Sequence, residues 1–250
     1  MESVSGHTIV VTGGASGIGL ALAIRFLQSG NTVILVGRRL SKLQEAKAAH
    51  PGFHIVVGDV GTPHGREALF LLLTTEHPSI DVFVNNAGIQ RTVDLKQGVT
   101  PDWDTISSEI NINYAGVVHT TLLWTPFLLK KPFAAFVNVT SGLSFAPLAS
   151  VPVYSSTKAA LHSFTWSLRY QLANTSIKVI EVIPPAVDTD LQAPGLHTFG
   201  VNVDEFADAV YARLGAGEVE IGFGMAEAAR LAFRQSFGEG FAQLNARFQT

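Results

Sequence analysis

The sequence contains no cysteine. This absence excludes disulfide bonds, thiolate metal sites and cysteine nucleophiles, and it suits a reducing compartment such as the cytoplasm, where we expect this chain. The eight histidines show no spacing typical of metal ligands. We therefore expect no metal site.

Charge is also scarce. Charged residues make up 15% of the chain, and the net charge is −3, so we expect no nucleic-acid partner. No apolar run approaches the ~20 residues of a membrane span, and the N-terminus lacks the basic and apolar segments of a signal peptide. We expect neither feature.

What the chain does have is a large apolar share, 47% of 250 residues, which is enough for one domain with a substantial core. Short apolar runs alternate with longer helical patterns, which predicts an α/β fold with a doubly wound parallel sheet of about seven strands and helices on both faces. We predict a single domain over 1–250. Strands are predicted at Thr8–Thr12, Thr32–Val36, His54–Val57, Val82–Asn85, Ala134–Thr140, Lys178–Ile183 and Glu218–Gly222, and helices at Ile18–Gln28, Ser41–Ala49, Pro63–Thr75, Asp102–Leu129 and Tyr154–Leu172.

A glycine-rich turn follows the first predicted strand. Gly13, Gly17 and Gly19 let the backbone turn tightly, and a helix pattern begins at Ile18; we predict that these residues and Ser16 bind the cofactor. The first turn of that helix offers unpaired N–H groups and the positive end of its dipole to a phosphate. Because the turn stands between a strand and a helix, we interpret it as a dinucleotide site rather than a structural turn.

The end of the second predicted strand bears on the choice of dinucleotide. An acidic residue there would accept hydrogen bonds from the ribose of NAD, but Arg38 and Arg39 stand in that place. A guanidinium suits a 2′-phosphate, so we predict NADP(H) over NAD(H), with Arg38 as the main contact. The alternative is a solvated pair at a helix start.

Tyr154 and Lys158 lie one helical turn apart and so share a helix face. A free tyrosine has a pKa near ~10, and a neighbouring ammonium favours the phenolate. The pair therefore predicts a proton donor with a lowered pKa, although this spacing also arises by chance on many helices.

Further motifs fall at the predicted strand ends and in a long helix. Asp59 and Val60 follow the third strand, Asn85-Asn86-Ala87-Gly88 ends the fourth, Asn113 lies in a helix, and Ser141 ends the fifth, thirteen residues before Tyr154. Carboxyl ends of parallel strands form one ligand-binding edge, so Ser141 and Tyr154 are expected to meet.

In the order and spacing of these motifs the chain resembles the short-chain dehydrogenase/reductase family, in its compact branch, from Thr8 to about Gly222. Its tail, Glu218-Val-Glu-Ile221-Gly222, is similar to the DltE-like subgroup. The resemblance implies a single-domain Rossmann fold. It also implies that Tyr154 is the general acid and base, that Lys158 lowers its pKa and binds the nicotinamide ribose, that Ser141 hydrogen-bonds the substrate oxygen, and that Asn113 holds a relay water.

The resemblance extends to the cofactor cleft. It implies that Asp59 and Val60 flank the adenine, and that Asn85, Ala87, Gly88, Pro184, Val187 and Thr189 line the cleft. One departure is Pro185, which stands where the family carries glycine; proline fixes φ and has no N–H. A second is Ser16, in place of a basic residue common in NADP-dependent members.

Two loops are expected to shape the substrate site. The residues assigned to it are mostly apolar, which indicates a neutral, fairly hydrophobic ketone or secondary alcohol; the alternative is that they only pack a lid. They are Ser141, Leu143, Phe145, Leu148, Gln90 and Leu191.

The C-terminal segment 223–250 carries Phe233, Phe237, Phe241, Leu244 and Phe248 on one helix face, interrupted by Gly238 and Gly240. Core packing, a lid and a subunit contact all fit this pattern. The family resemblance implies a homodimer or homotetramer.

The function implied is that of an NADP-dependent carbonyl reductase or alcohol dehydrogenase. The alternatives are a non-catalytic dinucleotide sensor, which would not need all four site residues, and an epimerase or dehydratase.

Overall fold

A computed structural model describes residues 4–94, 96, 102–193 and 195–245, with the backbone alone from 235 to 245. Seven parallel strands form one sheet in the order β3-β2-β1-β4-β5-β6-β7, as the sequence predicts. The strands are β1 Thr8–Thr12, β2 Thr32–Gly37, β3 His54–Val57, β4 Val82–Asn85, β5 Ala134–Val139, β6 Ile177–Ile183 and β7 Glu220–Gly222.

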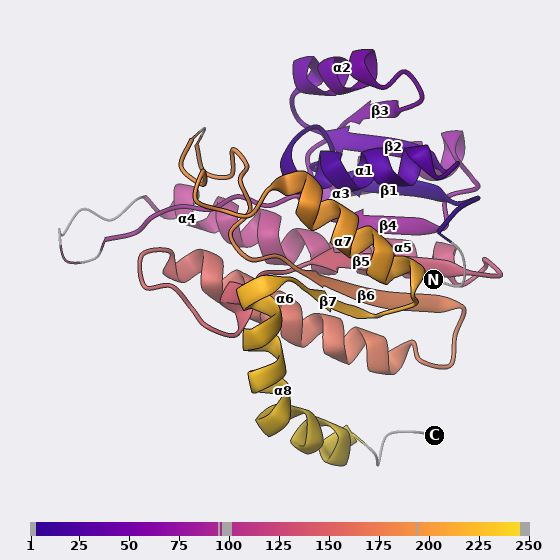
Figure 1. Ribbon diagram of the computed structural model, residues 1–250. Helices are drawn as coiled ribbons and strands as arrows, with labels where there is room; N and C mark the ends of the chain where they lie inside the picture. Colours follow the sequence, from indigo (N-terminus) through magenta and orange to yellow (C-terminus); the bar gives the residue numbers. More distant parts are fainter. Residues whose placement is uncertain (1–3, 95, 97–101, 194, 246–250) are drawn as a thin grey trace.

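Helices cover both faces of the sheet (Figure 1). Alternate strand residues explain this: Ile9 and Val11 of β1 pack with α1, α2 and α7, while Val10 packs with α3, α5 and α6. The helices are α1 Gly17–Gln28, α2 Leu40–Ala49, α3 Pro63–Glu76, α4 Trp103–Ile110, α5 Gly116–Leu128, α6 Pro152–Gln171, α7 Val203–Gly215 and α8 Gly224–Asn245.

The long helix predicted over Asp102–Leu129 is interrupted. A π-helical turn, Asn111–Ala115, joins α4 to α5, and such turns often mark functional sites because they re-aim the side chains within them. Here the turn contains Asn113.

Two helices of the C-terminal third differ from the prediction. Helix α7 was not predicted, although Phe206, Ala207, Val210 and Leu214 are buried at helical spacing and the Asn202 side chain caps its first turn. Gly238 and Gly240 do not end the last helix, since α8 runs through to Asn245. Figure 1 shows α8 projecting away from the sheet.

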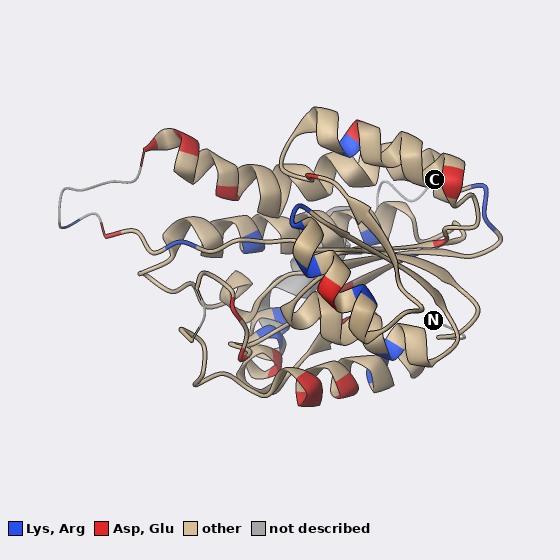
Figure 2. Ribbon diagram, turned by 90° about the horizontal axis from the view of Figure 1, so that it is seen from above, with Lys and Arg blue, Asp and Glu red and all other residues tan. Residues whose placement is uncertain are grey.

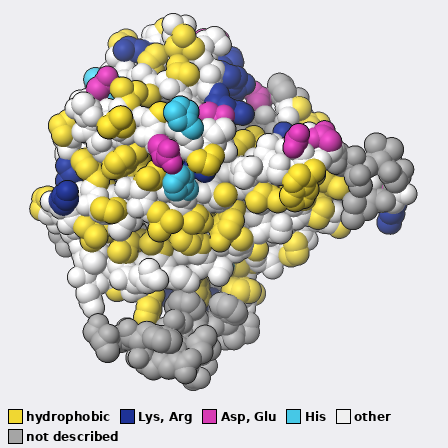
Figure 3. Space-filling view, turned by 180° about the vertical axis from the view of Figure 1, so that it is seen from behind, with side chains coloured by type: hydrophobic (Ala, Val, Ile, Leu, Met, Phe, Trp, Pro, Cys, Tyr) yellow, Lys and Arg dark blue, Asp and Glu magenta, His cyan; other side chains and the backbone are white. Residues whose placement is uncertain are grey.

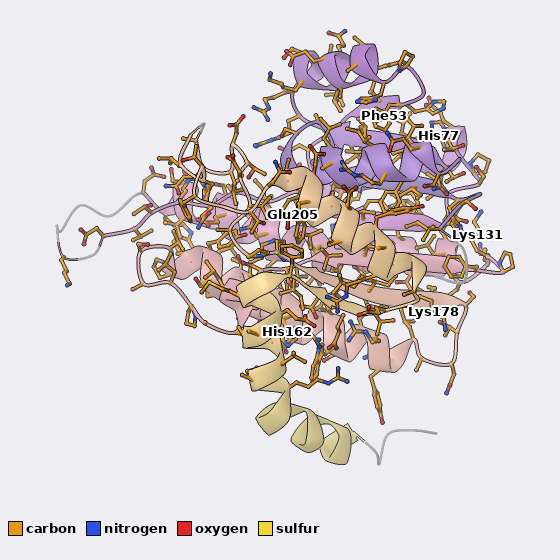
Figure 4. All side chains as sticks on the ribbon, in the orientation of Figure 1. Phe53, His77, Lys131, His162, Lys178 and Glu205 are labelled. Carbon is orange, nitrogen blue, oxygen red and sulfur yellow. The ribbon has the colours of Figure 1, made fainter. Side chains whose placement is uncertain are left out.

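Of the five apolar residues predicted to share a helix face in the C-terminal segment, only Phe233 has a described side chain. Its ring packs against Phe145 at 5.3 Å and His162 at 5.8 Å between centroids. Phe237, Phe241 and Leu244 lie where only the backbone is described, and Phe248 lies outside the described residues. Figure 4 shows His162 where α6 meets α8.

Candidate active site

The strands end at a cleft of about 1380 Å³, which runs from the turn after β1 to the start of α8. Strand order reverses between β1 and β4, and the crevice at such a reversal is where open α/β sheets bind ligands. The volume exceeds the roughly 300–1,000 Å³ of a typical small-molecule pocket, so it suits a dinucleotide together with a second ligand.

The glycine-rich turn forms one end of this cleft. Gly13 has φ +64° and Gly17 has φ +54°, a backbone region that favours glycine, and the Gly13 amide donates to the Val36 carbonyl at 2.8 Å. Within the described residues the Ser16 hydroxyl makes no capping bond to α1. The first amides of α1 are therefore available to a phosphate.

Gly19 does not border the cleft, contrary to its assignment as a cofactor contact. A β-carbon placed there would lie 2.4 Å from the Asn86 side-chain nitrogen and 2.6 Å from the Gly13 carbonyl oxygen. Gly19 thus permits the close packing of α1 against the strand ends, and its effect on ligand binding is indirect.

Basic residues border the end of the cleft beyond β2. Arg38 and Arg39 both line it, as predicted, and Lys42 of α2 joins them. Asp59 and Val60 line the same end, and the Asp59 side chain accepts from the Gly61 amide at 2.8 Å, which fixes this turn. This end of the cleft therefore places positive side chains beside the turn that contains Asp59 and Val60.

The prediction for Asn85 is wrong, because its side chain is buried in the sheet and does not line the cleft. It donates to the Asn138 side-chain oxygen at 2.9 Å, and the two residues are paired in register between β4 and β5. Asn86 lines the cleft instead and donates to the Thr12 carbonyl at 3.0 Å. The next two residues, Ala87 and Gly88, line the cleft as predicted.

Ser141, Tyr154 and Lys158 meet on one wall of the cleft. Ser141 follows β5, and the other two lie on one face of α6, with Tyr154 8% and Lys158 4% exposed. The Lys158 ammonium donates to the Val139 carbonyl at 2.8 Å and lies 5.6 Å from the centroid of the Tyr154 ring. The sequence prediction that these three side chains meet is borne out by their positions.

The predicted lowering of the Tyr154 pKa is wrong for the protein without ligands. Burial raises the pKa of Tyr154 to about 12; a hydrogen bond with Ser141 lowers it, and the charge of Glu109 raises it. Burial likewise lowers the pKa of Lys158 to about 8. Desolvation acts on both members of the pair and is the largest cause of each shift.

Asn113 is fully buried and does not reach the cleft surface. Its side chain clamps the loop after β4, accepting from the Ile89 amide at 2.9 Å and donating to the Ile89 carbonyl at 2.8 Å. Asn113 Oδ1 and Lys158 Nζ both border the space beside Gly88, at 3.4 Å and 3.7 Å from a β-carbon placed there.

Two charged residues near this wall were missed by the sequence analysis. Arg91 lines the cleft, and Glu109 of α4 is 0% exposed behind it. Burial raises the pKa of Glu109 to about 7, although the charge and the amide of Arg91 both lower it. The position of Glu109 in the helical pattern does not predict this burial, because the burial depends on how α4 packs against α6.

At the substrate end Gln90, Leu143, Leu148 and Leu191 line the cleft as predicted. Phe145 does not; its ring packs against His162, with centroids 4.6 Å apart, below the cleft wall. Phe145 and Phe233 together seat α8, whose first turns bring Met225, Ala226 and Ala229 into the cleft.

The loop after β6 closes the other side. Pro184, Val187 and Thr189 line the cleft as predicted, together with Pro185. The Pro184 carbonyl accepts from the Gly142 amide at 2.9 Å, which ties this loop to the Ser141 segment. Gln192, at φ +74°, donates to Thr92 at 2.9 Å and joins the two loops that flank the substrate end.

Charge elsewhere is dispersed, and Figure 2 shows acidic and basic residues interspersed around the ribbon. Over the described ranges, no group of three or more His, Asp or Glu side chains could hold a metal ion. None of the helices in these ranges is both long and apolar enough to cross a bilayer.

Comparison with known proteins matches residues 7–198 to the short chain dehydrogenase family model. An uncharacterized oxidoreductase, DltE of Bacillus subtilis, is 44% identical over 247 residues, 97% of this chain and 98% of that protein. A Sphingobium yanoikuyae short-chain dehydrogenase in complex with NADPH has a TM-score of 0.84 at 24% identity, covering 95% of each chain. A Burkholderia phymatum short-chain dehydrogenase/reductase in complex with NAD has a TM-score of 0.82 at 19% identity, covering 98% of this chain and 97% of that one.

The matched family model spans most of the sheet and all four residues predicted to be catalytic, and the similarity to DltE extends over almost the whole length, including the tail. This chain is an oxidoreductase that belongs to the short-chain dehydrogenase family.

Proposed function

We propose that this protein is an NADP(H)-dependent carbonyl reductase or alcohol dehydrogenase that acts on a neutral, fairly hydrophobic ketone or secondary alcohol. The observation that carries the proposal is the meeting of Ser141, Tyr154 and Lys158 on the wall of a cleft whose other end is the glycine-rich turn. Gly13 and Gly17, with positive φ, and the α1 amides fit a pyrophosphate.

When bound, the nicotinamide supplies or accepts a hydride. The chain's own residues handle the proton: Tyr154 donates it to the carbonyl oxygen as charge develops there, and Ser141 donates a hydrogen bond that steadies the same oxygen. Lys158 places an ammonium beside the phenol and would hold the nicotinamide ribose. A water beside Gly88, between Asn113 and Lys158, would return the proton to Tyr154.

Arg38 supports the choice of NADP(H), since it borders the cleft where a 2′-phosphate would lie. Similar structures include complexes with NADPH or NADP and one with NAD, so the preference rests on this chain's own residues. Replacing Arg38 by leucine is expected to weaken NADPH binding by about 10- to 100-fold and to leave NADH binding nearly unchanged, because a charge-assisted bond to phosphate contributes about 1.5–3 kcal/mol.

Fluorescence titration of the wild type, Arg38→Leu and Arg39→Leu with both cofactors measures this. Arg39→Leu is the matched comparison and is expected to have a smaller effect. Wild-type protein that binds NADH as tightly as NADPH would overturn the preference.

The substrate class rests on Leu143, Leu148 and Leu191. Arg91 adds a cation to this end, but the buried Glu109 behind it balances the charge. We expect NADPH consumption with apolar ketones of graded size, and little with phosphorylated analogues. Efficient turnover of a dianionic substrate, with none for neutral ketones, would contradict this class.

Two alternatives and two further features stay predictions. The four intact site residues disfavour a non-catalytic sensor, and we rank an epimerase or dehydratase lower.

Figure 3 shows hydrophobic side chains gathered on the face seen from behind. The exposed Leu71 of α3, Trp103 of α4 and Leu122 of α5 suit a homodimer or homotetramer. A cytoplasmic location remains an expectation.

A further inference from the structure

The Glu109 carboxyl is a buried charged group that lacks an ordinary partner. The side chain is 0% exposed, and neither oxygen has a hydrogen-bond partner among the described residues. The Arg91 amide lies near enough to favour the carboxylate, but its geometry falls short of a hydrogen bond. Because burial of an unsatisfied acid is costly, such a group calls for a specific explanation.

The packing of α4 and its π turn against α6 places this carboxyl beside the proton donor. All strands are parallel, so these helices, which both return across one face of the sheet, run in the same direction. The Asn113 side chain donates to Thr157 at 3.3 Å. One turn earlier on each helix are Glu109 and Tyr154.

The counter-charge comes from the loop after β4. Asn113 clamps Ile89 by two hydrogen bonds, and two residues later Arg91 lines the cleft, close enough for its charge to lower the pKa of Glu109. Within the described residues one guanidinium nitrogen of Arg91 is buried and unpaired. Glu109 therefore faces Arg91 from this loop and Tyr154 from α6, with Lys158 one turn farther along α6.

We propose that Glu109 is a further positioning residue of this site, a buried carboxylate that is balanced by Arg91 and acts through its field on the proton of the Tyr154 hydroxyl. The effect of Glu109 on catalysis rests on the proposed function, because it concerns the same proton transfer. The effect of Glu109 on the pKa of Tyr154 does not rest on it, because both groups are present in the protein without ligands.

The direction of the effect follows from the titration of the two groups. Burial raises the pKa of Glu109 to about 7, so the group is neutral below that pH and charged above it. The charged form raises the pKa of Tyr154. Above pH 7 the charged Glu109 therefore raises the pKa of Tyr154 further, which opposes loss of the hydroxyl proton and so opposes the use of Tyr154 as a base in alcohol oxidation.

Glu109→Gln, which keeps the size and removes the charge, tests the proposal. With tyrosine labelled at the ring carbon that bears the hydroxyl, NMR reports the phenolate fraction of each of the four tyrosines, and Tyr154→Phe assigns the signal. We expect the Tyr154 phenolate fraction at pH 11 to rise about threefold or more in Glu109→Gln. The exposed Glu76→Gln, at the end of α3, is the matched control and is expected to match the wild type.

A folded Glu109→Gln protein with an unchanged Tyr154 titration would overturn the proposal and leave Glu109 a packed acid only. If the variant does not fold, NMR of the wild type decides: a Tyr154 ring signal that shifts as the Glu109 carboxyl titrates supports the proposal, and a signal that stays constant through that titration overturns it. In kinetics, the rise of alcohol oxidation with pH, which follows proton loss from Tyr154, is expected to move to lower pH in Glu109→Gln. Absence of turnover with any substrate would contradict the proposed function, while the titrations would still decide the role of Glu109.

Discussion

Replacing Tyr154 by phenylalanine is expected to lower kcat/KM for ketone reduction by about 10²- to 10⁴-fold, which is the contribution of a positioned general acid. The ring of phenylalanine fills the same space on the wall of the cleft, so the loss reflects the proton and not the packing. Since Tyr154 is only 8% exposed, we expect water to replace it poorly as the acid in the variant.

The measurement is initial-rate NADPH consumption by the wild type and Tyr154→Phe, with NADPH affinity and thermal midpoint as controls. Both controls are expected to change little. Ser141→Ala provides the graded comparison and is expected to lose about 10- to 100-fold, because it removes a hydrogen bond and not the proton. A Tyr154→Phe protein within tenfold of wild-type activity would exclude Tyr154 as the acid.

Replacing Lys158 by methionine is expected to abolish most activity and yet to stabilise the cofactor-free protein. Activity should fall by about 10²- to 10³-fold, because the ammonium beside the phenol and its proposed contact with the ribose are both lost. Stability should rise because burial lowers the pKa of Lys158 to about 8, which means that the charged form is held in the fold at a cost.

The direction of this stability change follows from proton linkage. Lysine in the unfolded chain keeps its proton up to a pH of about 10.4, whereas folded Lys158 loses it near 8, so stability rises between these values and the full cost applies at pH 7. That cost is about 3 kcal/mol. The Val139 carbonyl loses its donor in the variant, which offsets about 1 kcal/mol.

A net gain of about 2 kcal/mol corresponds to roughly 4–8 °C in the thermal midpoint of a chain of this size. Thermal unfolding of the wild type and Lys158→Met at pH 7 and pH 10 measures it, and the difference should shrink at pH 10, where wild-type Lys158 is neutral. A variant that is less stable at pH 7, or equally stabilised at both pH values, would contradict the buried-charge account.

Patterns within one element predicted much of this structure. The apolar runs gave all seven strands, and the Tyr154–Lys158 spacing placed both side chains on one face of α6. The turn motif at Gly13 and Gly17 located the end of the cleft, because their backbone angles are needed locally. The signals for α7 were also local, an Asn202 cap and buried residues at helical spacing, and were overlooked.

The predictions that were wrong concern residues whose positions depend on contacts between elements. Asn85 and Asn86 are adjacent, and only the register of β4 with β5 turns Asn85 toward Asn138 and leaves Asn86 at the cleft. Phe145 lies under the cleft because α8 covers it. The raised pKa of Tyr154 and the burial of Glu109 follow from packing between helices, which a helical pattern does not specify.

The most direct test of the account is label transfer from NADPH carrying deuterium on both positions of the nicotinamide C4, incubated with apolar ketones and analysed by mass spectrometry of the alcohol product. We predict deuterium at the carbinol carbon with the wild type, and at least ~10²-fold less product with Tyr154→Phe at equal NADPH binding. Tight NADPH binding by the wild type without label transfer to any ketone would contradict the account.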